Sequence, residues 1–451
     1  MSFKKLNNIV GWFVFLIATI VYVLTLETTV SWWDCGEYIS TAYKLQVGHP
    51  PGAPLFQMIG RFFSLFAFGD VTKVALMINL MSALCSSFTI LFLFWTITHL
   101  SKKMWMKDGE AAPLSNKVAV LATGVIGALA YTFSDSFWFS AVEGEVYAMS
   151  SLFTAITFWA ILKWEAEADD KHNLRWLILI AFLIGISIGV HLLNLLAIPA
   201  ITYVFYFKKY PNVEKNKKRN FILVGIISML LVAVILYFIV PYIVIFAGKF
   251  EIFFTNSIGL PFNTGTIIYF VLLIGLLVAG ILYSIKKGKV VLNTVILSVL
   301  FILIGYTTFF VLVIRSNANT PINENAPKDA TALLTYLNRE QYGDTPLLHG
   351  QYYNAMPVDQ KESSSKYIKD EENGKYIEVK QRGKIVYESN KTTIFPRMWS
   401  GDESRNHPTY YKMWAGISEG SDRTPTFAEN LKYFFRYQVN HMYWRYFMWN
   451  F

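Results

Sequence analysis

The stretch "SWWDCGEYISTAYKLQVGHPPGAPLFQMIGR", residues 31–61, places ionisable side chains directly after the first long apolar run. Asp34 and Glu37 are three residues apart, so on a helix both carboxylates would share one face. His49 and Arg61 follow, separated by a proline-rich turn that stops any helix and stiffens the chain. Carboxylates can move protons and cations can hold anions, and ionisable residues at a membrane edge are candidates for function. The alternative is a loop whose acids are simply solvated.

A second group of acids lies in "SDSFWFSAVEGEVYAMS", which contains Asp135, Glu143 and Glu145. The pattern places Glu145 at the start of a helix, where a carboxylate can cap the helix and interact with its dipole. Capping is therefore one interpretation. The other is that Glu145 faces the acids of residues 31–61 across a shared cavity.

Four further residues are candidates for binding, each with a structural alternative. His191 and Asn194 fall in a short turn of "GVHLLNLLAIP", where packing would explain them equally. Arg315 stands at the exit of an apolar run, where it can grip a phosphate or extend its charge to the membrane surface. Arg445 lies among aromatic residues in "MYWRYFMWNF", as a phosphate ligand or an interface anchor.

The composition assigns these residues to a membrane protein. Of 451 residues, 54% are hydrophobic and only 16% are charged, against roughly a quarter in soluble domains. The apolar residues fall in runs long enough to cross a hydrocarbon core of about 30 Å. We predict an all-α polytopic protein with about nine spans, near residues 9–27, 74–98, 117–133, 146–163, 175–190, 193–207, 221–243, 266–285 and 291–314.

The positive charges predict the orientation of these spans. Lysines and arginines concentrate in alternate loops, which places the N-terminus in the cytoplasm and the C-terminus outside. The net charge of +9 is explained in this way, without a nucleic-acid partner. The first run is long for a signal peptide and lacks a cleavage site, so we expect it to be retained. All the candidate residues then lie on the outer side.

Two regions follow from the same reading, residues 1–314 in the membrane and residues 315–451 outside it. The first outer loop, 28–73, is aromatic and contains apolar residues at helical spacing, so part of it should be a helix along the interface. After "RSNANTPINENAPKDA" the chain becomes polar and mixed α/β. "KYIEVKQRGKIVYE" predicts a hairpin that turns at Arg382-Gly383. We expect the C-terminal region to be a truncated part of a longer protein.

The strings "WWDCGEYI", "GHPPGAPLF", "AVEGEVYAMS" and "RSNANTPINEN" carry a resemblance to a known family. Acids after the first span and a proline turn about 15 residues later resemble GT-C glycosyltransferases of the protein O-mannosyltransferase type. The four strings look like a bacterial multi-pass family formerly of unknown function, related to a vertebrate transmembrane O-mannosyltransferase. The resemblance covers the membrane part, and residues 331–451 less closely.

The resemblance implies an enzyme of the bacterial inner (cytoplasmic) membrane. It would transfer a sugar, with mannose the expected one, from a polyprenyl-phosphate donor to a hydroxyl of a secreted protein, with inversion. The family's acids correspond to Asp34, as the general base, and Glu37, as its partner. His49, Arg61, Arg315 and Arg445 are candidates for the lipid phosphate, with Glu145, His191 and Asn194 as further substrate contacts.

Other functions and cofactors are less well supported by the sequence. The cytoplasmic loops contain no nucleotide-binding motif. A divalent cation held by Asp34, Glu37 and Glu145 is conceivable, but we predict no metal and no cofactor. A transporter or flippase of lipid-linked sugars is the main alternative, although its polar residues would be expected in mid-span rather than at the rim. A structural membrane protein would not need acids beside a rigid turn.

Overall fold

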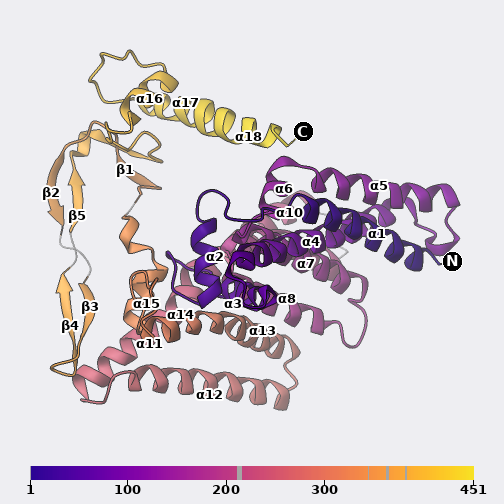
Figure 1. Cartoon of the computed structure of the whole chain (residues 1–451), viewed down its shortest axis with the longest axis horizontal. Coiled ribbons are helices and arrows are strands. Elements are labelled where there is room, and N and C mark those ends of the chain that lie inside the picture. Colours follow the sequence, from indigo (N-terminus) through magenta and orange to yellow (C-terminus); the bar gives the residue numbers. More distant parts are fainter. Residues whose placement is uncertain (1, 211–215, 344, 362–364, 381–382, 451) are drawn as a thin grey trace. The chain divides into compact units, whose positions relative to one another are not determined.

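The computed structural model forms two compact units, residues 1–338 and 339–451. It describes residues 2–210, 216–343, 345–361, 365–380 and 383–450. The first unit is helical, and the second combines short strands with short helices (Figure 1). A mostly helical chain with a small mixed C-terminal region confirms the predicted fold class in outline.

Long helices form most of the first unit, with α1, α5 and α7 packed against α4 (Figure 1). Their buried faces meet in an apolar core, and the Tyr22 hydroxyl donates to the carbonyl of Thr132 at 3.0 Å, joining the ends of α1 and α5. The helices are α1 Phe3–Leu24, α2 Cys35–Lys44, α3 Pro54–Ser64, α4 Val74–Trp105, α5 Leu114–Thr132, α6 Asp135–Ala141, α7 Val146–Ala166, α8 Leu174–Ile188, α9 Ala197–Lys209, α10 Lys217–Val234, α11 Val240–Ile252, α12 Thr264–Lys286, α13 Val290–Tyr306, α14 Phe310–Asn317 and α15 Ala330–Leu337.

Each of the nine predicted spans falls on a helix, but not all of these helices have the length of a span. Within the described residues, seven helical segments are long and apolar enough to cross a membrane: Phe3–Leu24, Val71–Trp105, Leu114–Thr132, Val146–Ala166, Lys217–Ser257, Thr264–Lys286 and Val290–Asn317. The other two are shorter, because α8 has 15 residues and α9 has 13. The chain is thus a multi-pass membrane protein, and the number nine stays a prediction.

The short helix α8 packs closely along α13. A Cβ atom at Gly185 would lie 2.3 Å from the carbonyl oxygen of Ile302, and one at Gly305 would lie 2.2 Å from the backbone nitrogen of Ile186. Glycines that let two backbones meet are typical of helix contacts within membranes. The contact therefore depends on the absence of both side chains.

The segment Lys217–Ser257 is one helical run with two π-helical turns. The first turn, Ile235–Ile239, directly precedes Pro241, which has no N–H to give to the helix. The second, Phe253–Ser257, follows Glu251, whose buried carboxylate accepts hydrogen bonds from the backbone nitrogens of Asn263 and Thr266 at 2.5 and 2.9 Å. This carboxylate fixes the corner between α11 and α12.

The first outer loop has the helix, turn and helix that the sequence predicts. Helix α2 ends at Lys44, the proline-rich turn follows, and α3 begins at Pro54, where a proline suits the first helical position. Trp32 and Trp33 are exposed just before α2, as expected for rings at a membrane interface. Two short 3₁₀ turns, Leu65–Ala67 and Val71–Lys73, then lead into α4.

The second unit contains three antiparallel strand pairs, which correct the predicted hairpin. Strand β4 Lys375–Lys380 pairs with β3 Ser365–Asp370, while β5 Lys384–Tyr387 pairs with β2 Pro357–Lys361. The strands were placed correctly and their pairing was wrong, because Asn373-Gly374 is the stronger turn signal. Arg382 lies outside the described residues. The remaining elements are β1 His349–Gln351 with β6 Thr392–Ile394, α16 His407–Ala415, α17 Phe427–Tyr433, the π-helical segment Phe434–Trp444 and α18 Arg445–Met448.

The contact between α8 and α13 predicts a difference between two glycine substitutions. Gly305→Ala should lower stability by about 1–3 kcal/mol, because the methyl group would push the two backbones apart. Gly275→Ala in α12 is the control, since a Cβ atom there meets nothing within 4 Å and should be neutral or slightly stabilising. Thermal unfolding of the purified chain in detergent measures both. Equal midpoints for the two variants would contradict the packing.

Candidate active site

Helix α2 presents the two acids predicted from its spacing. Asp34 lies at the N-cap position, with a side chain that is 61% exposed, and Glu37 lies in the first turn, 27% exposed. The residue before them, Trp33, has a φ of 62°, which turns the chain sharply into the helix. The carboxylate of Asp34 makes no capping bond to the helix. It therefore points outward while Glu37 faces the following turn.

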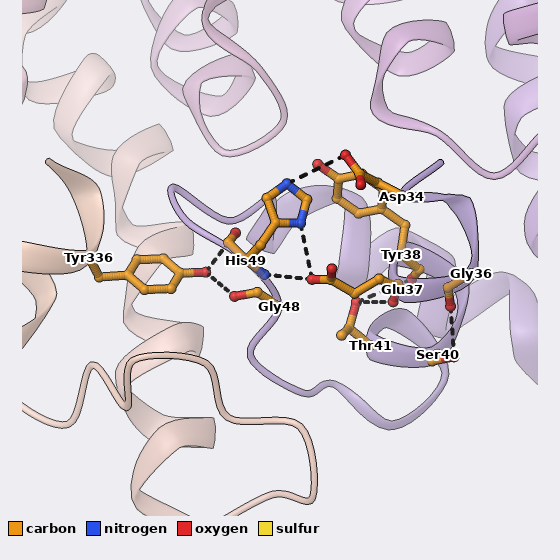
Figure 2. Close-up of polar contacts among 9 residues, drawn as sticks. All are labelled: Asp34, Gly36, Glu37, Tyr38, Ser40, Thr41, Gly48, His49 and Tyr336. Carbon is orange, nitrogen blue, oxygen red and sulfur yellow. Dashed lines mark hydrogen bonds and ion pairs between the residues drawn. The ribbon is translucent and has the colours of Figure 1, made fainter. Parts of the chain in front are cut away.

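His49 lies between the two acids (Figure 2). The Oε1 atom of Glu37 accepts a hydrogen bond from the backbone nitrogen of His49 at 2.5 Å and lies 3.1 Å from its Nδ1. The Nε2 atom of His49 lies 3.9 Å from Oδ2 of Asp34. A Cβ atom at Gly48 would stand only 2.5 Å from Glu37 Oε1, so glycine is required there. The histidine thus links the helix acids to the proline turn.

The electrostatics of this pair favour the ionised forms. The hydrogen bond that the His49 ring donates to Glu37 raises the pKa of His49 above its usual value, against the effect of burial, and the charges of Glu37, Asp34 and Glu324 add to it. Burial alone would raise the pKa of Glu37, but the side-chain and backbone hydrogen bonds from His49 together hold it below its usual value. A protonated imidazole and an ionised carboxylate are the stable combination.

The peptide from Lys44 to His49 is held by residues far along the chain. Arg315 donates from Nε to the carbonyl of Leu45 at 2.6 Å and from an Nη atom to that of Lys44 at 3.2 Å. The Tyr336 hydroxyl lies 2.6 Å from the carbonyl oxygen of Gly48 and 3.2 Å from that of His49 (Figure 2). These contacts fix the turn that carries His49.

Residues 322–324 also hold this peptide, through backbone hydrogen bonds with Val47. Val47 donates to the carbonyl of Ile322 at 3.1 Å, and Glu324 donates back to the carbonyl of Val47 at 3.0 Å. The pairing brings the Glu324 side chain near Glu37 and His49. Burial, followed by the charge of Glu37, raises its pKa.

The second group of acids borders the first. Glu145 caps α7 as predicted, accepting from the backbone nitrogen of Val146 at 3.2 Å. Burial raises the pKa of Glu145 to about 7, and the charges of Glu143 and Asp34 contribute. The Ser31 hydroxyl donates to Glu143 at 2.5 Å, and burial raises the pKa of that carboxyl as well.

Tyr38 lies among these acids. Its ring contacts His49, with centroids 5.5 Å apart. Burial raises the pKa of its phenol, and the charges of Glu145, Asp34 and Glu37 raise it further. The phenol therefore stays protonated and can donate a hydrogen bond to an acid or a substrate oxygen.

The other predicted residues have partners outside this cluster. Arg61 donates to the carbonyl of Tyr43 at 2.8 Å and lies over its ring, joining α3 to α2. His191 lies with its ring 5.5 Å from that of Tyr147, and burial lowers its pKa. Asn194 is buried and donates to Ser187 at 2.9 Å, which is a packing role. Arg445 belongs to the second unit, where its guanidinium lies over the ring of Trp449.

Several residues of the cluster were not among the predicted site residues: Tyr38, Glu143, Glu324 and Tyr336. Glu143 had a local signal, because it stands two residues before Glu145. Glu324 stands in the string "RSNANTPINEN", but the only residue of that string predicted for the site was Arg315. Tyr336 had no signal, since nothing near it in the sequence indicates that it meets the first loop. Among the described residues, no three His, Cys, Asp or Glu side chains are grouped as metal ligands. That no metal is needed stays a prediction.

The pair of Glu37 and His49 predicts a shift in the titration of the histidine. In Glu37→Gln the pKa of His49 should fall below that in the native protein, because burial remains while the charge is lost. Histidine NMR signals followed against pH measure this pKa, with His191 as an internal reference. An unchanged His49 pKa would contradict the contact.

The same pair sets a pH range of greatest stability in the native protein. It should stabilise the fold most between pH 4.5 and 6.5. Stability is lost below this range as Glu37 is protonated, and above it as His49 is deprotonated.

Glu145 predicts a change in stability with pH. Because its folded pKa of about 7 lies above the usual 4.5, the native protein should lose stability as pH rises through this interval. Glu145→Gln keeps an oxygen for the α7 cap and removes the titration. The stability of the variant minus that of the native protein should therefore be larger at pH 8 than at pH 4. Unfolding midpoints at the two pH values test this, and an unchanged difference would show that the carboxyl is not buried.

Comparison with known proteins relates the first unit to one family. Residues 34–214 match the family model described as "Protein O-mannosyl-transferase TMEM260 N-terminal domain", and residues 343–435 match a family of unknown function, DUF8416. No solved structure matches. Asp34, Glu37, His49 and Glu145 all lie within the first match, which begins at Asp34.

Two curated relatives agree with this match. The chain is 31% identical over 142 residues to "Protein O-mannosyl-transferase tmem260" of Dictyostelium discoideum and 30% identical over 176 residues to "Protein O-mannosyl-transferase TMEM260" of Mus musculus. These segments cover 32% and 39% of this chain but only 15% and 22% of the relatives. The predicted resemblance is confirmed: residues 34–214 match the N-terminal domain of TMEM260-like protein O-mannosyl-transferases, to which the chain shows a distant and partial similarity.

Proposed function

We propose that this chain is the membrane part of a glycosyltransferase that moves a sugar, mannose by analogy with its relatives' names, to a protein hydroxyl. The donor would be a polyprenyl-phosphate sugar and the acceptor a serine or threonine of a secreted protein. The observation that carries the proposal is the linked set of Asp34, Glu37 and His49 within the segment that matches the O-mannosyl-transferase family.

Asp34 is the proposed base. Its carboxylate is the more exposed of the two helix acids and can therefore reach a hydroxyl on a mobile acceptor. Asp34 would take the hydroxyl proton while the hydroxyl oxygen attacks the anomeric carbon. The bond from that carbon to the phosphate oxygen would break, and its electron pair would leave with the lipid phosphate. Attack opposite the leaving group inverts the configuration.

Glu37 and His49 are proposed to prepare this base rather than to react. Glu37 orients His49 through its two hydrogen bonds, and the imidazolium places a positive charge beside Asp34. Tyr38 and Glu145 border the same space. The neutral phenol of Tyr38 and the carboxyl of Glu145, which titrates near pH 7, can each donate a hydrogen bond to the sugar or accept one from it.

The lipid phosphate needs donors at the edge of the acid cluster. Arg61 belongs to the first loop and donates to the carbonyl of Tyr43, while Arg315 contacts the loop and donates to the carbonyls of Leu45 and Lys44. A guanidinium has five N–H donors, so these bonds leave capacity for a phosphate oxygen. We propose Arg315 and Arg61 as the phosphate side of the site, and His49 as the bridge between phosphate and base. Arg445 stays a candidate from the sequence alone.

The proposed orientation places this site outside the cytoplasm. The segments 174–188 and 197–209 are joined by a short turn, so they cross the membrane as a pair or not at all. The number of spans is odd in either case, nine or seven, and the lysine-rich loops keep the N-terminus inside. The close packing of α8 along α13 supports nine. Residues 315–451 would then face the secreted acceptor, with the membrane being the bacterial inner one.

The proposal predicts the loss of transfer on substitution of the acids. Asp34→Asn should reduce transfer from polyprenyl-phosphate mannose to a serine- or threonine-containing acceptor by about 10²- to 10⁴-fold, the usual contribution of a general base. Glu37→Gln should also reduce it, because His49 loses its partner. Asp135→Asn, an exposed acid at the same end of the helices, is the matched control and should keep full activity. Full activity of both folded site variants would refute the assignment.

A further inference from the structure

A second cavity lies at the opposite end of the same helices. It has a volume of about 400 Å³ and is bounded by the first turns of α1 and the last turns of α4 and α7. The acid cluster lies after the end of α1 and at the start of α7, so the length of the helices separates the two sites. The cavity is therefore independent of the proposed transfer reaction.

The lining of this cavity is strongly basic. Lys4, Lys102 and Lys163 lie around it together with His99, and its lining includes no acidic residue among those the structure describes. Glu165, which lies 4.0 Å from the Nε2 atom of His99, is not part of the lining and forms an ion pair with Lys103. The field inside the cavity therefore favours an anion.

The walls of the cavity are aromatic. Trp12, Trp95 and Trp159 line it, and the ammonium group of Lys163 lies 5.2 Å from the centre of the Trp159 ring. Trp12 is 48% exposed on the outer surface of α1, so this wall borders the surrounding lipid. Tryptophans beside lysines at helix ends are typical of the depth at which lipid headgroups meet acyl chains.

Three lining residues carry buried polar atoms that have no hydrogen-bond partner in the described part of the chain. These atoms are Asn7 Oδ1, Trp95 Nε1 and His99 Nε2. Buried polar atoms are rarely left unpaired, and an exception indicates a bound molecule or water. The cavity thus offers an indole donor and an amide acceptor beneath a ring of cations, which suits a ligand with phosphate and hydroxyl groups.

We propose that this cavity binds the headgroup of an anionic phospholipid of the leaflet around the N-terminus. The lysines would contact the phosphate, the buried polar atoms would contact the headgroup hydroxyls, and the tryptophans would border the glycerol and acyl chains. Basic pockets between membrane helices on the cytoplasmic side are known to suit anionic headgroups. The lining of the cavity combines charges of a single sign with aromatic walls. This combination distinguishes a binding site from a general attraction of lysines to the membrane surface.

The test compares matched lysine variants of the full chain. Lys4→Gln/Lys102→Gln removes two cations from the lining, whereas Lys5→Gln/Lys107→Gln removes two nearby exposed cations that do not line it. Native mass spectrometry of the detergent-solubilised protein with phosphatidylglycerol measures retained lipid. The cavity variant should bind about 30-fold more weakly, at about 1 kcal/mol for each lysine, while the control should bind like the native protein. Lys4→Arg/Lys102→Arg should keep binding, which excludes a folding defect.

Three outcomes would overturn the proposal. An equal loss in the Lys5 and Lys107 control would show a diffuse surface charge instead of a site. Equal binding of phosphatidylcholine, with the same response to the variants, would show that the headgroup charge is not recognised. Displacement of the lipid by inorganic phosphate at equal concentration would show a free-phosphate site.

Discussion

The double hydrogen bond from His49 to one oxygen of Glu37 is the interaction on which the candidate active site depends. It joins the first turn of α2 to the proline turn, and it requires a glycine at position 48, where a side chain would occupy the place of the carboxylate oxygen. The turn itself exposes carbonyl groups that need donors. The side chains of Arg315 and Tyr336 supply such donors, and so does the backbone nitrogen of Glu324. Residues 315–336 therefore hold the first loop in place.

This dependence explains which parts of the site could be predicted from the sequence. The spacing of Asp34 and Glu37, the stop at the prolines and the cap at Glu145 are local properties, and the structure has each of them. The partners of the turn are far along the chain, from a separation of 270 residues between Arg315 and Leu45 to 288 between Tyr336 and Gly48. The sequence of a turn does not indicate which distant residues donate hydrogen bonds to its carbonyl groups. Arg315 was therefore predicted as a phosphate ligand without its bonds to Leu45 and Lys44.

The same distinction applies to the fold. Long apolar runs predicted helical segments at all nine proposed spans, because a membrane requires a continuous apolar segment. The short helices α8 and α9, with the break at His191 between them, follow the predicted spans 175–190 and 193–207, whereas the short helices α6 and α15 were not predicted. In the second unit, alternation found the strands, but pairing depends on the turn, and Asn373-Gly374 formed the hairpin in place of the predicted one. Periodicity describes a single element, whereas pairing is a property of two.

The charges at the two ends of the bundle impose different demands. Asp34, Glu37, Glu143, Glu145 and Glu324 gather at one end with His49 as the cation among them. A lipid phosphate would be repelled by this cluster, so the proposed donor would approach at the other end of α2, where Arg61 and Arg315 donate to the carbonyls of Tyr43 and Leu45. Burial raises the pKa of Glu145 to about 7, which reduces the negative charge of the cluster at neutral pH and lowers the same barrier. Burial of this carboxyl and binding of the proposed anionic donor are therefore compatible, because burial partly neutralises an acid that would repel the donor.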